Sequence, residues 1–420
     1  MKVLFISTYD IQGGAAIAAT RLLQAMRLAG CDVSMVVRVK KGDDASVFTA
    51  GNEKMNKARF YWERGVIYLH NRLSRENLFD VSIANTGVPV TKLPAFKEAD
   101  VVHLHWINQG MLSVREIGNI LSSGKKVVWT MHDMWPFTGI CHYAGTCNAF
   151  TFGCSHCPYL KKPSRKDLSY SVYHQKQLAY RKGNIIFTAC SRWLMELAKQ
   201  SPLTQGHKVV SIPNPIDTGI YLPKDKNAIR EKMGLPTDRK IVLFAAMKAS
   251  DKRKGIDYLV EASRLIAQQR NDLLFLVAGT NGEEIAGQFS LPTQSIGYVA
   301  PHDMPDLYNA ADLFVTPSLQ DNLPNTIMEA MACGTPCLGF RTGGIPEMID
   351  HQRNGYVANY QDAKDLADGL LWTLFEADAG TLSSNARRKV MEYYTQETVA
   401  QQYKEIYERK QQHNRQGILG

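Results

Sequence analysis

Short apolar segments rich in strand-forming residues alternate with helix-forming segments along most of this chain. The apolar segments include KVLFIS at residues 2–7, KVVWTMH at 126–132, KIVLFAA at 240–246 and DLLFLVAG at 272–279. A helix-forming segment such as AAIAATRLLQAMRLAG, at 15–30, follows the first of them. This alternation is typical of proteins whose parallel strands are joined by helices. The sequence therefore predicts an α/β fold with parallel sheets.

The length of the chain predicts two domains. A chain of 420 residues is too long for one hydrophobic core of ordinary size. Regular patterning lapses in VVSIPNPIDTGIYLPKDK, at 209–226, where prolines frame an asparagine. We therefore predict a first domain over residues 1–212 and a second over 213–395. Residues 396–420 are polar and amphipathic, and we expect them to form a helix that returns to the first domain.

Composition and charge narrow the classes of protein. The chain is 45% hydrophobic and 21% charged, which is typical of a globular protein. Its apolar runs are shorter than the roughly 20 residues that span a bilayer, and its start lacks a cleavage site for secretion. We therefore expect a cytoplasmic protein with eight reduced cysteines.

The charge of the chain is unevenly distributed. Residues 1–210 hold 27 Lys and Arg against 14 Asp and Glu (+13), and the remainder holds 22 against 26 (−4). The basic first half predicts an anionic partner.

Two loops of the first half carry candidate ligand groups. Gly13 and Gly14 lie between the first strand and the first helix, where backbone N–H groups can approach a phosphate. A Gly-Gly pair can also be only a turn. His132 follows the strand at 126–131, and Asp133 beside it could fix the tautomer of the imidazole. A histidine in this place can also cap the next segment.

Two loops of the second half carry a stronger pattern. One of them is cationic: a predicted helix near Ile256 is preceded by Lys248, Lys252, Arg253 and Lys254. Cations at the start of a helix oppose its dipole unless an anion lies among them.

The other loop lies in the stretch PSLQDNLPNTIMEAMACGTP (317–336). Pro324 predicts a helix start there, with the N–H groups of Asn325, Thr326 and Ile327 pointing out of the helix. Asp321 and Glu329 flank this anion site. They suit a ligand with both a diphosphate and hydroxyls, although a capping acid and a solvated helical Glu would give the same pattern.

These motifs together resemble those of a known enzyme family. KGIDYLVEA, GYV with ADLFVTPS, the acid pair running into EAMACGTP, and GGIPE resemble the second domain of the retaining glycosyltransferases of family 4. The segment HDMWPFTGICHY with the following CSHCPYL resembles bacterial exopolysaccharide transferases of the colanic-acid type. The resemblance implies the GT-B fold, in which two Rossmann-like parallel-sheet domains face each other across a cleft. It also implies a first domain on the acceptor side and a second that binds a nucleotide sugar.

The resemblance assigns roles to residues that match the family motifs. It implies that Glu329 holds ribose hydroxyls and that Asp321, where the family usually has Glu, holds sugar hydroxyls. Asn325 and Thr326 match positions whose amides meet the diphosphate. The remaining matches are Lys254 for neutralising the diphosphate, Gly13 and Gly14 for closing over it, Tyr298 of the GYV segment for donor binding, and His132 for the sugar. Arg253, beside Lys254, is a further donor-binding candidate. The family arginine falls near Met247, so Arg253 or Lys248 would have to replace it.

The expected reaction is transfer of a sugar from a nucleotide-diphosphate donor to a hydroxyl, with retention and without a catalytic cofactor. The chain has no D-x-D motif, the usual metal clasp of the other large transferase fold, so we expect no metal in catalysis. The resemblance implies catalytic roles for His132, Lys254, Asp321 and Glu329, and front-face attack assisted by the leaving phosphate. Two alternatives are a nucleotide-sugar epimerase of the same fold and a basic nucleic-acid-binding protein. The second does not explain the acid pair, so no nucleic acid is expected.

Residues 54–75 are a candidate for contact with the acceptor. The segment KMNKARFYWERGVIYLHNRLSR interleaves six cations with four aromatic residues. Such a basic amphipathic segment suits an anionic membrane surface or a lipid-diphosphate acceptor. The expected acceptor is therefore a glycan or a polyprenyl-diphosphate-linked sugar, with the protein peripheral to the inner face of the cell membrane. A solvated helix over a core is the alternative.

Four of the eight cysteines lie within seventeen residues, at Cys141, Cys147, Cys154 and Cys157. A C-x2-C turn lets two thiolates hold one tetrahedral ion, and two more cysteines complete the set. The spacing predicts a structural metal site, such as zinc, in which His142 or His156 could replace a thiolate. Two disulfides and four buried thiols are the alternatives.

Overall fold

The computed structural model describes residues 1–409 and divides them into two compact units. Unit 1 comprises residues 1–189 and 195–212 together with the described residues from 397 on. Unit 2 comprises residues 190–194 and 213–396. The boundary at 212 between the predicted domains coincides with the boundary between the two units. The segment 190–194 differs, because the prediction includes it in the first domain and the structure groups it with unit 2.

Unit 1 is built on a seven-stranded parallel sheet of order β3-β2-β1-β4-β5-β6-β7. Its strands are β1 (Lys2–Tyr9), β2 (Asp32–Val39), β3 (Val47–Thr49), β4 (Val101–Leu104), β5 (Lys126–Met131), β6 (Ile185–Ala189) and β7 (Lys208–Ser211). Its helices are α1 (Gly14–Leu28), α2 (Glu53–His70), α3 (Pro94–Glu98), α4 (Val114–Ser122) and α5 (Leu168–Tyr180). α6 (Arg192–Lys199) and α15 (Gln396–Glu408) each begin in residues grouped with unit 2 and end in unit 1.

Unit 2 is built on a six-stranded sheet of order β10-β9-β8-β11-β12-β13, again parallel. Its strands are β8 (Lys240–Lys248), β9 (Leu273–Thr280), β10 (Thr293–Gly297), β11 (Leu313–Thr316), β12 (Cys337–Phe340) and β13 (Gly355–Ala358). Its helices are α7 (Lys226–Met233), α8 (Ile256–Ala267), α9 (Gly282–Ala286), α10 (Met304–Ala310), α11 (Asn325–Ala332), α12 (Ile345–Met348), α13 (Ala363–Leu371) and α14 (Ala379–Tyr393).

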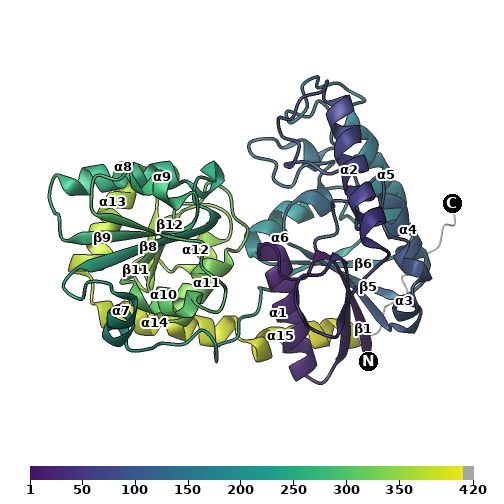
Figure 1. The fold of residues 1–420 in the computed structure, drawn as a ribbon. Helices are drawn as coiled ribbons and strands as arrows, with labels where there is room; N and C mark the ends of the chain where they lie inside the picture. Colours follow the sequence, from purple (N-terminus) through teal and green to yellow (C-terminus); the bar gives the residue numbers. More distant parts are fainter. Residues whose placement is uncertain (410–420) are drawn as a thin grey trace. The chain divides into compact units, whose positions relative to one another are not determined.

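Helices cover both faces of the sheet of unit 2 (Figure 1). α8, α9 and α13 pack over one face, and α7, α10, α11 and α14 pack over the other. Because helices cover both faces, β11 and β12 are buried along their whole length. Strands in this position are largely apolar for the same reason. The prediction of two Rossmann-like parallel-sheet domains is confirmed.

The prediction of irregular backbone across 209–226 is wrong at its start, because β7 pairs with β6 there. The strands β3 and β13 were not predicted either. All three are edge strands of only three or four residues, too short for alternation to identify them. Residues 410–420 of the predicted C-terminal helix lie outside the described residues. In the described part of the chain, no helix is both long and apolar enough to cross a membrane.

Candidate functional site

The cationic loop of unit 2 follows β8 at the carboxyl end of the sheet. Residues Lys252–Lys254 form a 3-10 turn, and α8 begins at Ile256, as predicted. Gly255 joins the two with φ of +69°, and a Cβ on it would lie 1.8 Å from the carbonyl oxygen of Pro317. Only glycine permits this approach, so the turn holds the cationic loop against the loop that follows β11.

The close approach brings Lys254 and Asp321 together. The Nζ of Lys254 lies 2.7 Å from Oδ2 of Asp321, and the two side chains are 24% and 14% exposed. The family resemblance implies separate ligand-binding roles for these two residues, but here the ammonium and the carboxylate neutralise each other. The ion pair fixes an ammonium group beside the loop that leads into α11.

The start of α11 differs in detail from the prediction. Pro324 is the N-cap with extended ψ of 118°, and the first helical residue is Asn325. The N–H of Ile327 donates to the carbonyl of Pro324 at 3.2 Å, so its predicted role as an outward-pointing donor is wrong. The Oδ1 of Asn325 accepts from Asn214 Nδ2 at 3.2 Å. Asn325 and Thr326 are half-buried at the helix end, and they remain the predicted anion-binding pair.

Glu329 is buried, with 7% of its surface exposed, on the second turn of α11. Its Oε2 accepts a 2.7 Å hydrogen bond from the hydroxyl of Tyr308 in α10. Burial, and secondly the carboxylate of Glu329, raise the pKa of Tyr308, so the hydroxyl stays protonated and donates. The alternative of a solvated helical Glu is therefore wrong. Tyr308 was not predicted, because an aromatic residue on a buried helix face is read as core.

The Gly-Gly turn of unit 2, at Gly343 and Gly344, supports the Asp321 loop. A Cβ on Gly343 would lie 1.6 Å from the carbonyl oxygen of Asp321, and one on Gly344 would lie 2.0 Å from that of Asn322. Both positions therefore require glycine. The nearby carboxylate of Glu347 accepts from the backbone N–H groups of Arg192 and Trp193 at 2.9 and 2.7 Å, which caps the first turn of α6.

Two further predicted donor-binding residues of unit 2 are exposed. Tyr298 directly follows the end of β10 and is 66% exposed. Arg253 is exposed in the 3-10 turn, with its Nη2 3.6 Å from Oδ2 of Asp251. Neither side chain takes part in the Lys254–Asp321 ion pair.

The glycine loop of unit 1 leads into α1 through a backbone conformation that favours glycine. Gly13 is the N-cap of α1 with φ of +91°, and Gly14 is the first helical residue. A Cβ on Gly13 would meet no heavy atom of the described structure within 4 Å. The glycine is therefore required by the backbone conformation and not by a packed neighbour.

His132 is half-buried at the carboxyl end of β5. Its Nε2 lies 3.2 Å from Nδ1 of His105, and burial lowers the pKa of His132 to about 4. The imidazole is therefore neutral near pH 7. The carboxylate of Asp133, which we expected to orient His132, accepts instead from His142 Nδ1 at 2.7 Å and Trp106 Nε1 at 2.8 Å.

Three histidines of unit 1, two of them buried and one half-buried, predict acid sensitivity. Burial lowers the pKa of His103 and His105 well below 6.5 and that of His132 to about 4. The unfolded chain therefore binds more protons than the fold below about pH 6.5, so stability is fully present above that pH and is lost as the pH falls toward 4. We expect the Tm of unit 1 to fall by at least a few degrees from about pH 7 to about pH 5. A His302→Gln variant should show the same slope, because His302 is exposed, and a Tm independent of pH would contradict the prediction.

The four-cysteine loop of unit 1 is packed despite having little regular structure. Cys141, Cys154 and Cys157 are buried, Cys147 is half-buried, and none forms a disulfide. Burial raises the pKa of Cys154 to about 11 and that of Cys157 to about 12. Across residues 1–409, no three His, Cys, Asp or Glu side chains are grouped so that they could hold a metal ion.

Neither histidine of this loop is placed as a substitute ligand. The ring nitrogens of His142 are both engaged, Nδ1 by Asp133 at 2.7 Å and Nε2 by Ser82 Oγ at 3.0 Å. His156 is exposed. Gly139 N–H donates to Cys154 Sγ at 3.1 Å, and the buried Nζ of Lys176 donates to the carbonyls of Trp135 and Thr138.

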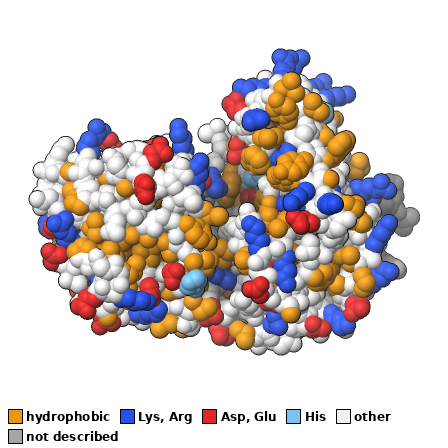
Figure 2. Space-filling model, viewed as in Figure 1, with side chains coloured by type: hydrophobic (Ala, Val, Ile, Leu, Met, Phe, Trp, Pro, Cys, Tyr) orange, Lys and Arg blue, Asp and Glu red, His pale blue; other side chains and the backbone are white. Residues whose placement is uncertain are grey.

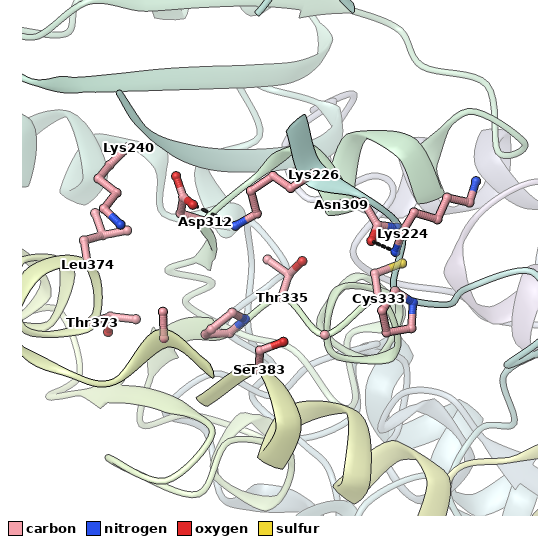
Figure 3. A pocket seen from close by; sticks show the side chains of 14 residues that line it. Lys224, Lys226, Lys240, Asn309, Asp312, Cys333, Thr335, Thr373, Leu374 and Ser383 are labelled. Carbon is pink, nitrogen blue, oxygen red and sulfur yellow. Dashed lines mark hydrogen bonds and ion pairs between the residues drawn. The ribbon is translucent and has the colours of Figure 1, made fainter. Parts of the chain in front are cut away.

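A separate pocket of about 140 Å³ lies at the other end of the sheet of unit 2 (Figure 3). Lys240 at the start of β8 and Asp312 just before β11 line it, so it opens at the amino ends of the strands. Asp312 pairs with Lys226 and Arg230, each at 2.7 Å. None of the predicted donor-binding residues lines this pocket.

Comparison with solved structures defines the class of fold. Sucrose-phosphate synthase from Thermosynechococcus elongatus superposes with a TM-score of 0.67 at 19% identity, covering 97% of this chain and 98% of that one. Anabaena Alr3699/HepE in complex with UDP and glucose superposes with a TM-score of 0.63 at 18% identity, covering 97% and 99%. The chain has the GT-B fold that these proteins share.

Family models identify the two halves. Residues 12–219 match the model of Glycosyltransferase Family 4, and residues 238–375 match that of Glycosyl transferases group 1. The chain therefore carries both of these glycosyltransferase family domains.

Individual relatives match over shorter ranges. N-acetyl-alpha-D-glucosaminyl L-malate synthase of Bacillus anthracis is 27% identical, covering 47% of this chain and 53% of the relative. Amylovoran biosynthesis glycosyltransferase AmsK of Erwinia amylovora is also 27% identical, covering 48% and 54%. The matched region thus spans about half the length of these relatives.

Proposed function

We propose that the chain transfers a sugar, with retention of configuration, from a nucleotide-diphosphate donor to an acceptor hydroxyl. One observation carries the proposal: the Lys254–Asp321 ion pair, at 2.7 Å, sits beside the loop leading into α11, the helix that also bears the buried Glu329. Cations and a helix end suit a diphosphate, while an oriented carboxylate suits a diol. Anabaena Alr3699/HepE, which shares the fold, was solved with UDP and with UDP-glucose, which fits a donor of this kind.

The reaction requires these residues to stabilise the negative charge that develops on the departing diphosphate. Lys254, Arg253 and the amides of Asn325 and Thr326 would supply it, without a metal ion. Glu329 would hold the ribose hydroxyls, and Tyr308 keeps its carboxylate in one orientation. Asp321 would exchange its bond to Lys254 for sugar hydroxyls when the diphosphate takes the cation.

Retention through front-face attack fits the state of the two carboxylates. Asp321 is paired with Lys254 and Glu329 is hydrogen-bonded to Tyr308, so neither is presented as a nucleophile. The leaving phosphate would accept the proton of the acceptor hydroxyl. The roles of Gly13, Gly14 and His132 in unit 1, and of Tyr298 in unit 2, remain predictions.

The acceptor we propose is a glycan or a polyprenyl-diphosphate-linked sugar in bacterial surface polysaccharide synthesis. The colanic-acid-type motif HDMWPFTGICHY supports it, and the relative AmsK is named for amylovoran biosynthesis. Such an acceptor would place the enzyme at the inner face of the cell membrane.

The deciding experiment is incubation with a panel of UDP-, GDP- and ADP-linked sugars, with release of nucleoside diphosphate as the readout. We expect release from at least one donor, increased by glycan or lipid-linked acceptors. Conversion of one nucleotide sugar into its epimer without release would instead establish the epimerase alternative. Binding of nucleic acid with no response to any donor would establish the remaining alternative.

We further propose that Cys141, Cys147, Cys154 and Cys157 bind a structural zinc ion after rotation of their side chains. The spacing, the burial of three of the thiols and the N–H donor at Cys154 support it. A tetrathiolate zinc centre carries two net negative charges, which the neighbouring buried Lys176 would partly balance.

Elemental analysis of protein purified without added metal tests the zinc proposal. We expect about one equivalent of zinc, with the four thiols protected from a thiol reagent until a chelator is added. A Cys31→Ser variant should retain the metal, because Cys31 lies outside this loop. Less than about a tenth of an equivalent, with all four thiols reacting freely, would contradict the proposal.

A further inference from the structure

The outer face of α2 exposes large apolar and aromatic side chains. Met55, Tyr61, Trp62 and Leu69 are 52%, 68%, 64% and 66% exposed. The opposite face of the helix is buried through Asn56, Glu63 and Ile67. Residues 55, 62 and 69 are seven positions apart, so they form one stripe along the helix. Aligned exposure of this kind marks an interaction surface.

The turn that follows α2 extends this face and is hydrogen-bonded to residues 159–161, directly after the four-cysteine loop. Asn71 Oδ1 accepts from the N–H of Lys161 at 2.7 Å, and Asn77 Nδ2 donates to the carbonyl of Tyr159 at 3.3 Å. Within the turn, Leu73 and Phe79 are 59% and 61% exposed. Residues 72–80 and 161–166 therefore form one tip, which with the outer face of α2 we call the α2 surface.

The tip is strongly basic. It holds six exposed cations against two acids, Glu76 and Asp80, for a net charge of +4; the cations are Arg72, Arg75, Lys161, Lys162, Arg165 and Lys166. Glu76 is already paired with Lys161. In Figure 2, hydrophobic side chains follow this part of unit 1 and Lys and Arg side chains gather at its end.

We propose that the α2 surface docks on a lipid bilayer with anionic headgroups. Trp and Tyr side chains favour the level of the headgroups, aliphatic side chains enter the acyl boundary, and Lys and Arg meet anionic lipids. A second copy of the chain is a poor occupant, because two tips of net charge +4 repel each other. This inference rests on the proposed function, which places the enzyme at the inner face of the cell membrane, and it assigns the membrane contact to the α2 surface. Docking is measured without a sugar donor, so a failure of docking can be distinguished from a failure of transfer.

Co-sedimentation with vesicles tests the docking. The full-length protein is mixed at low salt with phosphatidylcholine vesicles, with and without phosphatidylglycerol. We expect sedimentation only with the anionic vesicles, reduced at high salt, and a blue shift of Trp emission that is lost in Trp62→Ser. Sedimentation that does not depend on lipid charge, or none with either vesicle, would overturn the proposal.

Paired charge variants locate the surface. Lys162→Gln/Lys166→Gln should lower the partition coefficient on anionic vesicles by roughly 30-fold, since each cation near such a surface contributes about fivefold. The matched control, Lys92→Gln/Lys97→Gln, removes two exposed lysines of unit 1 outside the α2 surface and should leave binding unchanged. Equal effects of the two pairs would overturn the assignment of the surface. A concentration-dependent dimer that is lost in the Trp62→Ser variant would also overturn the proposal, because the α2 surface would then bind a second copy of the chain.

Discussion

Glu329→Gln is expected to abolish measurable sugar transfer while the protein remains folded. The substitution keeps the shape of the side chain and an oxygen that can accept from Tyr308, but it removes the negative charge. Two charge-assisted hydrogen bonds to a diol contribute about 1.5–3 kcal/mol each, so their weakening corresponds to a loss of roughly 10²–10⁴ in kcat/KM. Donor turnover measured by nucleoside diphosphate release, together with the Tm, checks the result.

A matched control separates loss of function from loss of charge. Glu376→Gln neutralises an exposed carboxylate of unit 2 at the end of the segment Trp372–Glu376. It should leave both turnover and Tm unchanged. Near-normal turnover in Glu329→Gln would refute the role of this carboxylate. A collapse of its Tm would show that the buried bond to Tyr308 is chiefly structural.

Lys254→Gln is expected to lower kcat by roughly 10²–10³, as does removal of a single group that stabilises developing charge in other enzymes. The ammonium group lies at hydrogen-bonding distance, 2.7 Å, from the carboxylate of Asp321, whereas the Nη2 of Arg253 lies 3.6 Å from the carboxylate of Asp251. Its loss would remove a preorganised positive charge from the departing diphosphate. Single-turnover kinetics at saturating donor measures the effect on the chemical step.

The ion pair itself provides the control for this prediction. If Lys254 serves only to neutralise Asp321, the double variant Lys254→Gln/Asp321→Asn should recover the activity lost in the single variant. If it stabilises the diphosphate, the double variant should remain at least as impaired. Lys364→Gln removes an ion-paired lysine at an exposed site and should have no effect.

The sequence alone determined the class of fold and the placement of the loops. Parallel strands that are covered on both faces are largely apolar, so most strands of both sheets could be recognised before any contact was known. Helix starts follow from local chemistry, which is why α8 and α11 begin within a residue of their predicted positions. The edge strands β3, β7 and β13 were not predicted, because their three or four residues show too little periodicity.

Only the tertiary structure decided which polar groups are partners. Lys254 and Asp321 are 67 residues apart, and they meet because Gly255 lets one loop touch the backbone of the other. Tyr308 reaches Glu329 across two packed helices, and Asp133 bonds to His142 and Trp106 while His105 bonds to His132. Local sequence sets which residues can form a strand, a turn or a helix end. Hydrogen bonds and ion pairs depend on distances of about 3 Å between groups remote in the chain, and packing alone fixes those distances.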